Sequence, residues 1–426
     1  MRKTGKSIAA LFVALMVVLT LMVPAFAAST ITQGATISAP TANSTATVNV
    51  ATGNAGDTLY LYQVIDANFD PASNNLTMDY TQLFKDFLTA TSTTLSLDSY
   101  DALASDSAAL KDILGAFTAY VKGLTPAPTA AKQATTDGSG KAVFSNVEMG
   151  QYIVIGGGNT TGALIYQTVT AEVVPHIDAN NEYKIASSYD VEMKVSTPAI
   201  EKEVQGTAQD GDKETASIGD IVEYTLTIAV PTYPAGATNK TFFIGDTLSN
   251  GLRLNADSIV VKGVAGANET TLAVPAAYTT NTAGATNNGG TFYVDFKFAE
   301  IAAYTNVVVT YTATITDQVA LGTTGTGNPN DVTLVYSNTP FNGNTWVPSG
   351  DPEDPDRPET SDPGYGSDDD TKTVYSYALV IDKYDSNETT KKLSKAVFEV
   401  YYGSEAPANL VATITTGEAA LQTSAA

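Results

Sequence analysis

Three polar side chains lie on strand faces that are otherwise apolar. Lys202 shares its face with Ile200 and Val204 in the strand-like segment IEKEV, because strand side chains alternate between two faces. Asp246 lies on the apolar face of the segment FFIGDTL, and Asn330 lies on the apolar face of the segment NDVTLVYSN. All three are therefore expected to point into a core, where an unpaired lysine ammonium costs several kcal/mol or loses its proton.

These residue types can react with one another once they are buried together. Removal from water lowers the pKa of Lys202, so that the amine becomes a neutral nucleophile, and raises the pKa of Asp246, so that the carboxyl stays protonated. The amine can then attack the amide carbon of Asn330, while Asp246 carries protons to the departing ammonia. The product would be a Lys–Asn isopeptide bond that forms once per molecule.

Alternatives remain open at this point. Asn338 has the same strand parity as Asn330 and is a second candidate acceptor. Glu223 is an alternative acid, but its parity places it on an outward face. In the plainest interpretation, Lys202 is a strand-edge lysine that reaches solvent and Asn330 belongs to an ordinary turn.

The surrounding sequence predicts the elements that would hold these residues. Alternating runs such as TLYLYQVI, QYIVIGG, IVEYTLTIAV and NVVVTYTATI recur between turn residues. This pattern is typical of an all-β protein made of tandem immunoglobulin-like β-sandwich domains. Residues 80–123 break the pattern with apolar residues at helical spacing, which predicts one or two helices packed on the first domain.

Composition and the N-terminus indicate an exported protein without metal or cofactor. Residues 1–27 combine a basic start, an apolar run and the sequence PAFA, as in a signal peptide cleaved after Ala27 or one residue later. With 45 acidic against 22 basic residues, the chain would repel nucleic acid. The absence of cysteine and the single His176 argue against a zinc site and against histidine-dependent hydrolases. No calcium-loop motif is present.

Changes in composition predict the domain boundaries. We expect a first domain over residues 28–195 and the isopeptide-forming sandwich over 196–346. The acidic, proline-rich segment 347–373 is predicted to be an extended, solvated linker. Residues 374–426 are too few for a β-sandwich and are interpreted as the start of an incomplete third domain.

Several segments resemble parts of Gram-positive pilins that sortases assemble. The segments EKEV, ASIGDIVEYTLTIAVP, FFIGDTLSNGLRL and GNPNDVTLVYSNTP resemble the isopeptide-forming middle domain of these pilins, in the expected order. LYLYQVIDA with GQYIVIGG is similar to the N-terminal pilin domain. LVIDKYDSNETTKKLSKAVFEVYYG resembles the start of a collagen-adhesin B-type domain.

The resemblance implies a role for each candidate residue. Lys202 would be the isopeptide lysine, Asp246 the catalytic acid and Asn330 the acceptor, with Asn338 still open. Lys383 would be the corresponding lysine of the third domain, whose partners are expected beyond residue 426. The tyrosine-proline-lysine motif that usually links pilin subunits is missing, and the junction reads YDVEMKVSTP. Its only lysine, Lys194, is expected to point outward, as a linkage lysine must.

The expected function is structural rather than enzymatic. The resemblance implies a secreted subunit of a cell-surface pilus, joined by sortase to copies of itself and to accessory pilins. The alternative is a monomeric, wall-anchored adhesin with a β-domain stalk, whose first domain binds a host or neighbouring-cell ligand.

Overall fold

The chain forms two compact units in the computed structural model. The structure describes residues 29–104, 107–157, 164–210, 213–322, 327–349, 354–377, 381–401 and 404–417. The first unit comprises residues 1–157 and 167–194, and the second comprises 158–166 and 195–426. The predicted signal peptide lies outside the described residues. Within the described ranges, no helix is both long and apolar enough to cross a membrane.

The first unit is built on two sheets and a helical insertion. In its described part, a five-stranded sheet has the order β10-β8-β4-β5, with β6 also paired to β4. Its strands are β4 (Thr58–Asp70), β5 (Asn75–Tyr80), β6 (Lys132–Thr135), β8 (Gly150–Gly156) and β10 (Val169–Val173). A four-stranded sheet has the order β1-β13-β3-β7. Its strands are β1 (Thr30–Ile31), β3 (Thr45–Ala51), β7 (Lys141–Glu148) and β13 (Ser188–Glu192). The short strands β2 (Ile37–Ser38), β11 (His176–Ile177) and β12 (Tyr183–Ala186) form a third, small sheet.

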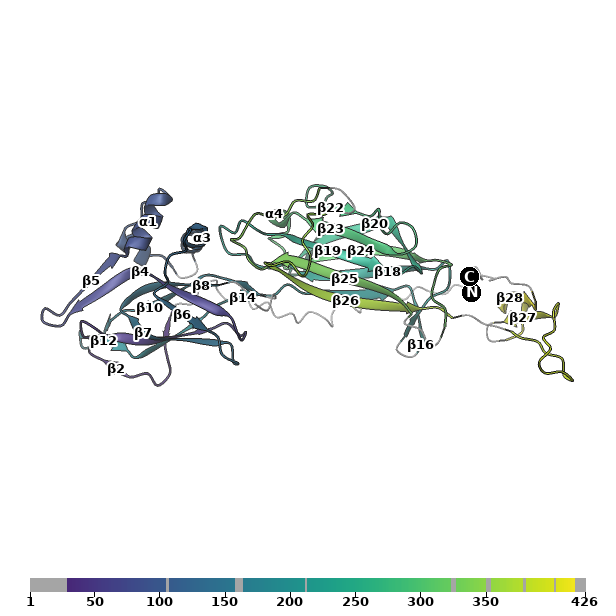
Figure 1. Ribbon diagram of the computed structural model, residues 1–426, viewed down its shortest axis with the longest axis horizontal. Coiled ribbons are helices and arrows are strands. Elements are labelled where there is room, and N and C mark those ends of the chain that lie inside the picture. Colours follow the sequence, from purple (N-terminus) through teal and green to yellow (C-terminus); the bar gives the residue numbers. More distant parts are fainter. Residues whose placement is uncertain are drawn as a thin grey trace. The chain divides into compact units, whose positions relative to one another are not determined.

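Three helices, where the sequence predicted one or two, occur in the described part of the insertion. They are α1 (Gln82–Ala90), α2 (Leu97–Asp101) and α3 (Ala108–Gly123). A Thr or Ser side chain accepts a backbone N–H at each N-cap, which satisfies a donor that the helix leaves free. The apolar stripe of α3 packs into one core with side chains of β4 and β8, and Figure 1 shows α1 and α3 beside that sheet.

The second unit is a two-sheet sandwich. In its described residues, a five-stranded sheet has the order β15-β18-β24-β20-β21. Its strands are β15 (Ile200–Gln205), β18 (Ile221–Ala229), β20 (Leu252–Ala265), β21 (Asn268–Thr271) and β24 (Asn306–Ile315). The facing seven-stranded sheet has the order β16-β17-β26-β25-β19-β23-β22. Its strands are β16 (Ala208–Asp210), β17 (Lys213–Thr215), β19 (Phe242–Leu248), β22 (Tyr278–Asn281), β23 (Gly290–Phe296), β25 (Asn328–Ser337) and β26 (Tyr365–Tyr375).

Alternating side chains from both sheets fill one core. Along β24 every second residue is buried, from Val307 to Ile315, and β18 alternates in the same way. This is the period of two that the sequence showed. The remaining elements of the unit are short: β9 (Ile165–Tyr166), β14 (Val195–Ser196), α4 (Phe298–Ile301), β27 (Val397–Tyr401), η1 (Pro407–Asn409) and β28 (Leu410–Thr415). The fold class predicted from the sequence, all-β with a helical insertion in the first unit, is confirmed.

The prediction of a solvated linker over residues 347–373 is wrong for its second half. Residues 365–374 of strand β26 pair with β25 in antiparallel register, and the two strands run side by side in Figure 1. The acidic run does not disorder this segment, because two of its carboxylates are used as acceptors. Ile200 donates its backbone N–H to Asp368 at 2.8 Å, and Lys202 donates its own to Asp370 at 2.7 Å.

These two bonds cover an exposed strand edge. β15 is the edge strand of its sheet, and β26 lies against it from the opposite sheet. Every second N–H group of an edge strand points away from its own sheet and has no backbone partner. The carboxylates of β26 are also two residues apart, so each can accept one of these N–H groups. The side chains of Asp368 and Asp370 therefore join the two sheets where backbone pairing stops.

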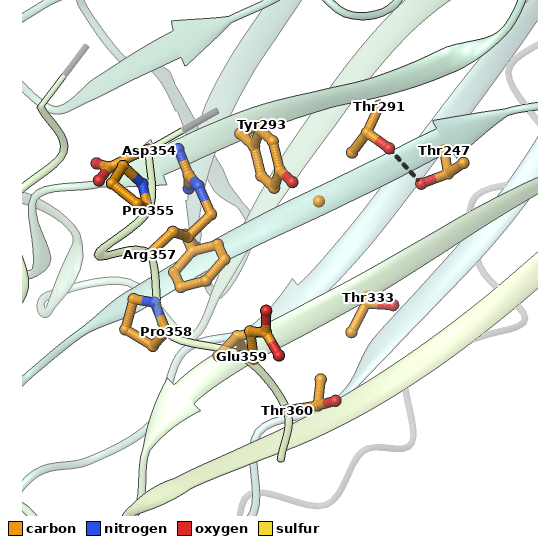
Figure 2. Close-up of a pocket in the computed structure, with 13 residues that line it drawn as sticks. Thr247, Thr291, Tyr293, Thr333, Asp354, Pro355, Arg357, Pro358, Glu359 and Thr360 are labelled. Carbon is orange, nitrogen blue, oxygen red and sulfur yellow. Dashed lines mark hydrogen bonds between the residues drawn. The ribbon is translucent and has the colours of Figure 1, made fainter. Parts of the chain in front are cut away.

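A second part of the predicted linker packs on the outer face of the seven-stranded sheet. Arg357 pairs with the buried Asp295, with Nη1 and Oδ1 at 2.5 Å. The guanidinium lies 3.8 Å from the ring centroid of Tyr293 and 4.5 Å from that of Trp346. Figure 2 shows Arg357 beside Tyr293, at one wall of a pocket of about 560 Å³. Burial raises the pKa of Asp295, and the neighbouring guanidinium of Arg357 opposes this rise.

We predict that Asp370→Ala opens the edge of β15. A hydrogen bond to a charged acceptor contributes about 1.5–3 kcal/mol, so the Lys202 amide should exchange roughly 10- to 100-fold faster. Hydrogen–deuterium exchange of the peptide that contains β15 measures this. Asp369→Ala is the matched control, because Asp369 is exposed and lies between the two aspartates that accept hydrogen bonds from β15. Equal exchange in both variants would contradict the assignment.

We predict that Arg357→Ala destabilises the second unit. The change leaves the Asp295 carboxylate buried without its partner, which should lower the free energy of unfolding by about 3 kcal/mol. The deficit should shrink as the pH is lowered through the raised pKa of Asp295, because protonation removes the unpaired charge. Urea unfolding at several pH values tests this, with the double variant Asp295→Asn/Arg357→Ala as the control that should recover part of the loss. A deficit that does not change with pH would contradict the explanation.

Candidate functional site

The three polar residues singled out in the sequence meet in the core of the second unit. Lys202 comes from β15 of the five-stranded sheet, whereas Asp246 on β19 and Asn330 on β25 come from the seven-stranded sheet. In the β19–β25 register Leu248 is opposite Asn330, so Asp246 and Asn330 lie diagonally on one face. Lys202, Asp246 and Asn330 each have 0% of their surface exposed.

A continuous chain of hydrogen bonds joins the three residues through a tyrosine. Lys202 Nζ donates to Asp246 Oδ1 at 2.8 Å. The hydroxyl of Tyr311, on β24, donates to the other carboxyl oxygen, Oδ2, at 2.6 Å. Asn330 Nδ2 in turn donates to the Tyr311 hydroxyl at 2.6 Å. The carboxyl group thus stands between the amine and the tyrosine, and the tyrosine stands between the carboxyl group and the amide.

Aromatic rings enclose this chain. Tyr224 stacks on Tyr311 with ring centroids 5.3 Å apart and an interplanar angle of 21°. Phe292 meets Tyr311 edge-on at 4.9 Å, and Lys202 Nζ lies 5.3 Å from the ring centroid of Tyr224. All three rings are buried. The polar groups therefore lie in an apolar and closely packed environment, where electrostatic interactions are strong and an unpaired charge is costly.

Burial moves the proton equilibria of the site toward the neutral forms. It lowers the pKa of Lys202, against the opposing attraction of Asp246, and it raises the pKa of Asp246. Both shifts favour a neutral amine beside a protonated carboxyl group over an ion pair. Burial also raises the pKa of Tyr311, so its hydroxyl keeps its proton. The site therefore brings together an amine, a carboxyl group and an amide, and burial favours the neutral forms that amide exchange needs.

The alternatives weighed from the sequence lie elsewhere. Asn338 is buried but eight positions along the chain from Asn330, roughly 27 Å at strand spacing. Glu223 is exposed, as its parity predicted. The structure thus brings Asn330, and not Asn338, next to the Lys202–Asp246 pair.

The two other lysines named from the sequence do not belong to this site. Lys194 is only partly exposed and its Nζ is buried, so the outward position expected of a linkage lysine is not observed. Lys194 lies beyond the end of β13, so the alternation of side chains along that strand does not extend to it. Lys383 is exposed and precedes β27.

Sequence reasoning missed Tyr311 and Asp370. Tyr311 lies on the same strand face as Val307, Val309 and Ala313 in NVVVTYTATI, so the sequence pattern predicts that its side chain points inward. A tyrosine in the middle of a buried strand face needs a partner for its hydroxyl, and that requirement was the available signal. Asp370 lies in a run of three aspartates, where composition gave no indication that alternate carboxylates face a neighbouring strand.

Part of the second unit is similar to a family of known proteins. Residues 218–340 match the model of the Gram-positive pilin backbone subunit 2, Cna-B-like domain. This segment of the second unit is therefore similar to a Gram-positive pilin backbone domain. The match includes Asp246, Tyr311 and Asn330 and begins after Lys202.

Individual relatives extend the similarity over more of the chain. The chain is 31% identical over 250 residues to the trypsin-resistant surface T6 protein of Streptococcus pyogenes serotype M6, covering 58% of this chain and 44% of that protein. It thus spans less than half the length of this curated relative. The solved T6 backbone pilin of serotype M6 Streptococcus pyogenes aligns with a TM-score of 0.61 and 22% identity, over 89% of this chain and 73% of that one. This likeness supports the fold.

A further solved structure is the major pilin SpaD of Corynebacterium diphtheriae. It aligns with a TM-score of 0.45 and 17% identity, over 89% of this chain and 80% of that one.

Proposed function

We propose that this chain is a structural subunit of a covalently assembled cell-surface pilus, and that an isopeptide bond between Lys202 and Asn330 stabilises its second unit. The observation that carries the proposal is the buried hydrogen-bonded chain from Lys202 through Asp246 and Tyr311 to Asn330. A purely structural core would gain little from it, because burying a lysine and an aspartate costs more than their attraction usually returns.

The proposed reaction is an amide exchange within one molecule. The neutral Nζ of Lys202 attacks Cγ of Asn330, and ammonia leaves as the new amide forms. Asp246 acts as the acid and base that moves protons during the exchange. Because the fold holds the groups together, proximity replaces an encounter in solution, and no cofactor is needed.

The position of the bond fits a role under load. It would join β15 of one sheet to β25 of the other, across the sandwich core. It would also close a loop of about 130 residues, which restricts the unfolded chain by on the order of 4–5 kcal/mol in the loop-entropy model for cross-links. A chain without cysteine would thereby gain a covalent brace of the kind that disulfides give to exported proteins.

The proposed partners are other pilin subunits at the cell surface. Sortase would join copies of this chain to one another and to accessory pilins. The T6 relative is described as a trypsin-resistant surface protein, and its solved homologue as a backbone pilin. We expect a ladder of covalent multimers in the wall fraction of cells that produce the protein. A single-sized species that binds a ligand would instead favour a wall-anchored adhesin, and loss of the ladder in Lys194→Ala would assign the linkage lysine.

We predict that the recombinant chain is about 17 Da lighter than its sequence requires, since each bond releases one ammonia. Lys202→Ala and Asn330→Ala should abolish the shift, and Asp246→Ala should abolish or greatly slow it. Intact-protein mass spectrometry measures all four proteins. Asn338→Ala is the matched control and should keep the full shift. A folded wild-type chain of unshifted mass would sink the proposal.

A further inference from the structure

We propose that Tyr311 is a catalytic residue of the isopeptide reaction, through which a proton passes between Asp246 and the departing nitrogen of Asn330. This inference rests on the function proposed above and adds a group that the sequence did not indicate. It follows from the order of the hydrogen bonds in the core, where the tyrosine hydroxyl stands between the acid and the amide.

The two oxygens of the Asp246 carboxyl group have different partners. Oδ1 accepts from Lys202 Nζ at 2.8 Å, and Oδ2 accepts from the Tyr311 hydroxyl at 2.6 Å. Asn330 Nδ2 contacts the same hydroxyl at 2.6 Å. Within the described hydrogen bonds, the path from the acid to the nitrogen that must leave as ammonia therefore runs through the tyrosine oxygen.

The relay can be written with every proton accounted for. The lone pair of neutral Lys202 Nζ forms a bond to Cγ of Asn330, and one Nζ proton passes to Oδ1 of Asp246. Asp246, which enters as the carboxylic acid, releases the proton on Oδ2 to the oxygen of Tyr311, and Tyr311 passes its own proton to Nδ2. The Cγ–Nδ2 bond then breaks and ammonia leaves with three protons. The transfer requires that the two hydrogen bonds of Tyr311, which in the structure run from Nδ2 to the hydroxyl and from the hydroxyl to Oδ2, first reverse direction. Tyr311 ends with one proton, as it began, and Asp246 ends as a carboxylic acid with its proton on Oδ1 instead of Oδ2.

The surroundings of Tyr311 suit this role. Its ring is held by the stacked Tyr224 and the edge-on Phe292, so the hydroxyl has little freedom to leave the path. Tyr311 is 1% exposed, and the carboxyl and amide groups beside it are fully buried. Bulk water therefore cannot take the place of the hydroxyl as a proton carrier. A phenylalanine would fill nearly the same volume, so packing alone does not require the hydroxyl.

The test compares the rates of ammonia loss in Tyr311→Phe and in the wild-type chain. Each is made from residue 28 onward by cell-free translation, and samples are quenched in acid at intervals and weighed intact. Tyr311→Phe should react at least about a hundredfold more slowly, because loss of a positioned acid–base group typically costs 10²–10⁴ in rate. Tyr278→Phe is the matched control, since it removes a buried hydroxyl of the same unit outside the chain of hydrogen bonds. It should react at the wild-type rate.

A second measurement separates proton transfer from packing and remains informative if Tyr311→Phe does not fold. A 3-fluorotyrosine placed at position 311 keeps the ring and the hydroxyl but is a stronger acid. It should speed the loss of ammonia several-fold, whereas the same residue at position 278 should have no effect.

The outcomes distinguish this inference from the proposed function. A wild-type chain that never loses ammonia would overturn both. A wild-type chain that reacts, with folded Tyr311→Phe reacting equally fast, would overturn only the role of Tyr311. An unchanged rate with 3-fluorotyrosine at position 311 would also overturn it.

Discussion

The second unit depends on the burial of a lysine and an aspartate in one apolar core. Removing Lys202 and Asp246 from water penalises their charged forms, so burial lowers the pKa of the lysine and raises the pKa of the aspartate, which favours a neutral amine beside a carboxylic acid. In an ordinary core this arrangement would be a liability that apolar residues could replace at no loss. With the amide of Asn330 reached through Tyr311, the same groups could carry out the proposed reaction, whose product would have no charge.

The rest of the sandwich serves to bring these groups together. Lys202 lies on an edge strand, which by itself would be free to move away from the opposite sheet. Strand β26 prevents this, because Asp370 accepts the backbone N–H of the same lysine from across the sandwich. The hydrogen bond between the two sheets thus lies beside the place where the proposed covalent bond would form. A fibre pulled from its ends would then meet resistance at this edge.

Strand parity was sufficient to find the three polar residues that meet in the core of the second unit. Lys202, Asp246 and Asn330 were each recognisable as polar residues on an apolar face, and the structure places all three in one core. Parity could not choose between Asn330 and Asn338, since it does not measure distance along a strand. Tyr311 escaped notice because a tyrosine on an apolar face is normally explained by packing.

The prediction of a solvated linker from composition was wrong where an acidic segment pairs with a strand far away in the sequence. The run of aspartates before Lys372 is unfavourable for a strand in isolation, and only its pairing with β25 and its contacts with β15 stabilise it. Such contacts join residues about 170 positions apart, beyond the range of any pattern within a short window. The partial burial of Lys194 likewise depends on what packs around it.

The central claim is that Lys202 and Asn330 are joined, and peptide mapping of the folded wild-type chain tests it most directly. After proteolysis, tandem mass spectrometry should find a branched peptide in which the segment around Lys202 is linked by an amide to the segment around Asn330. Two separate linear peptides, one with a free Lys202 amine and one with an intact Asn330 amide, would contradict the account.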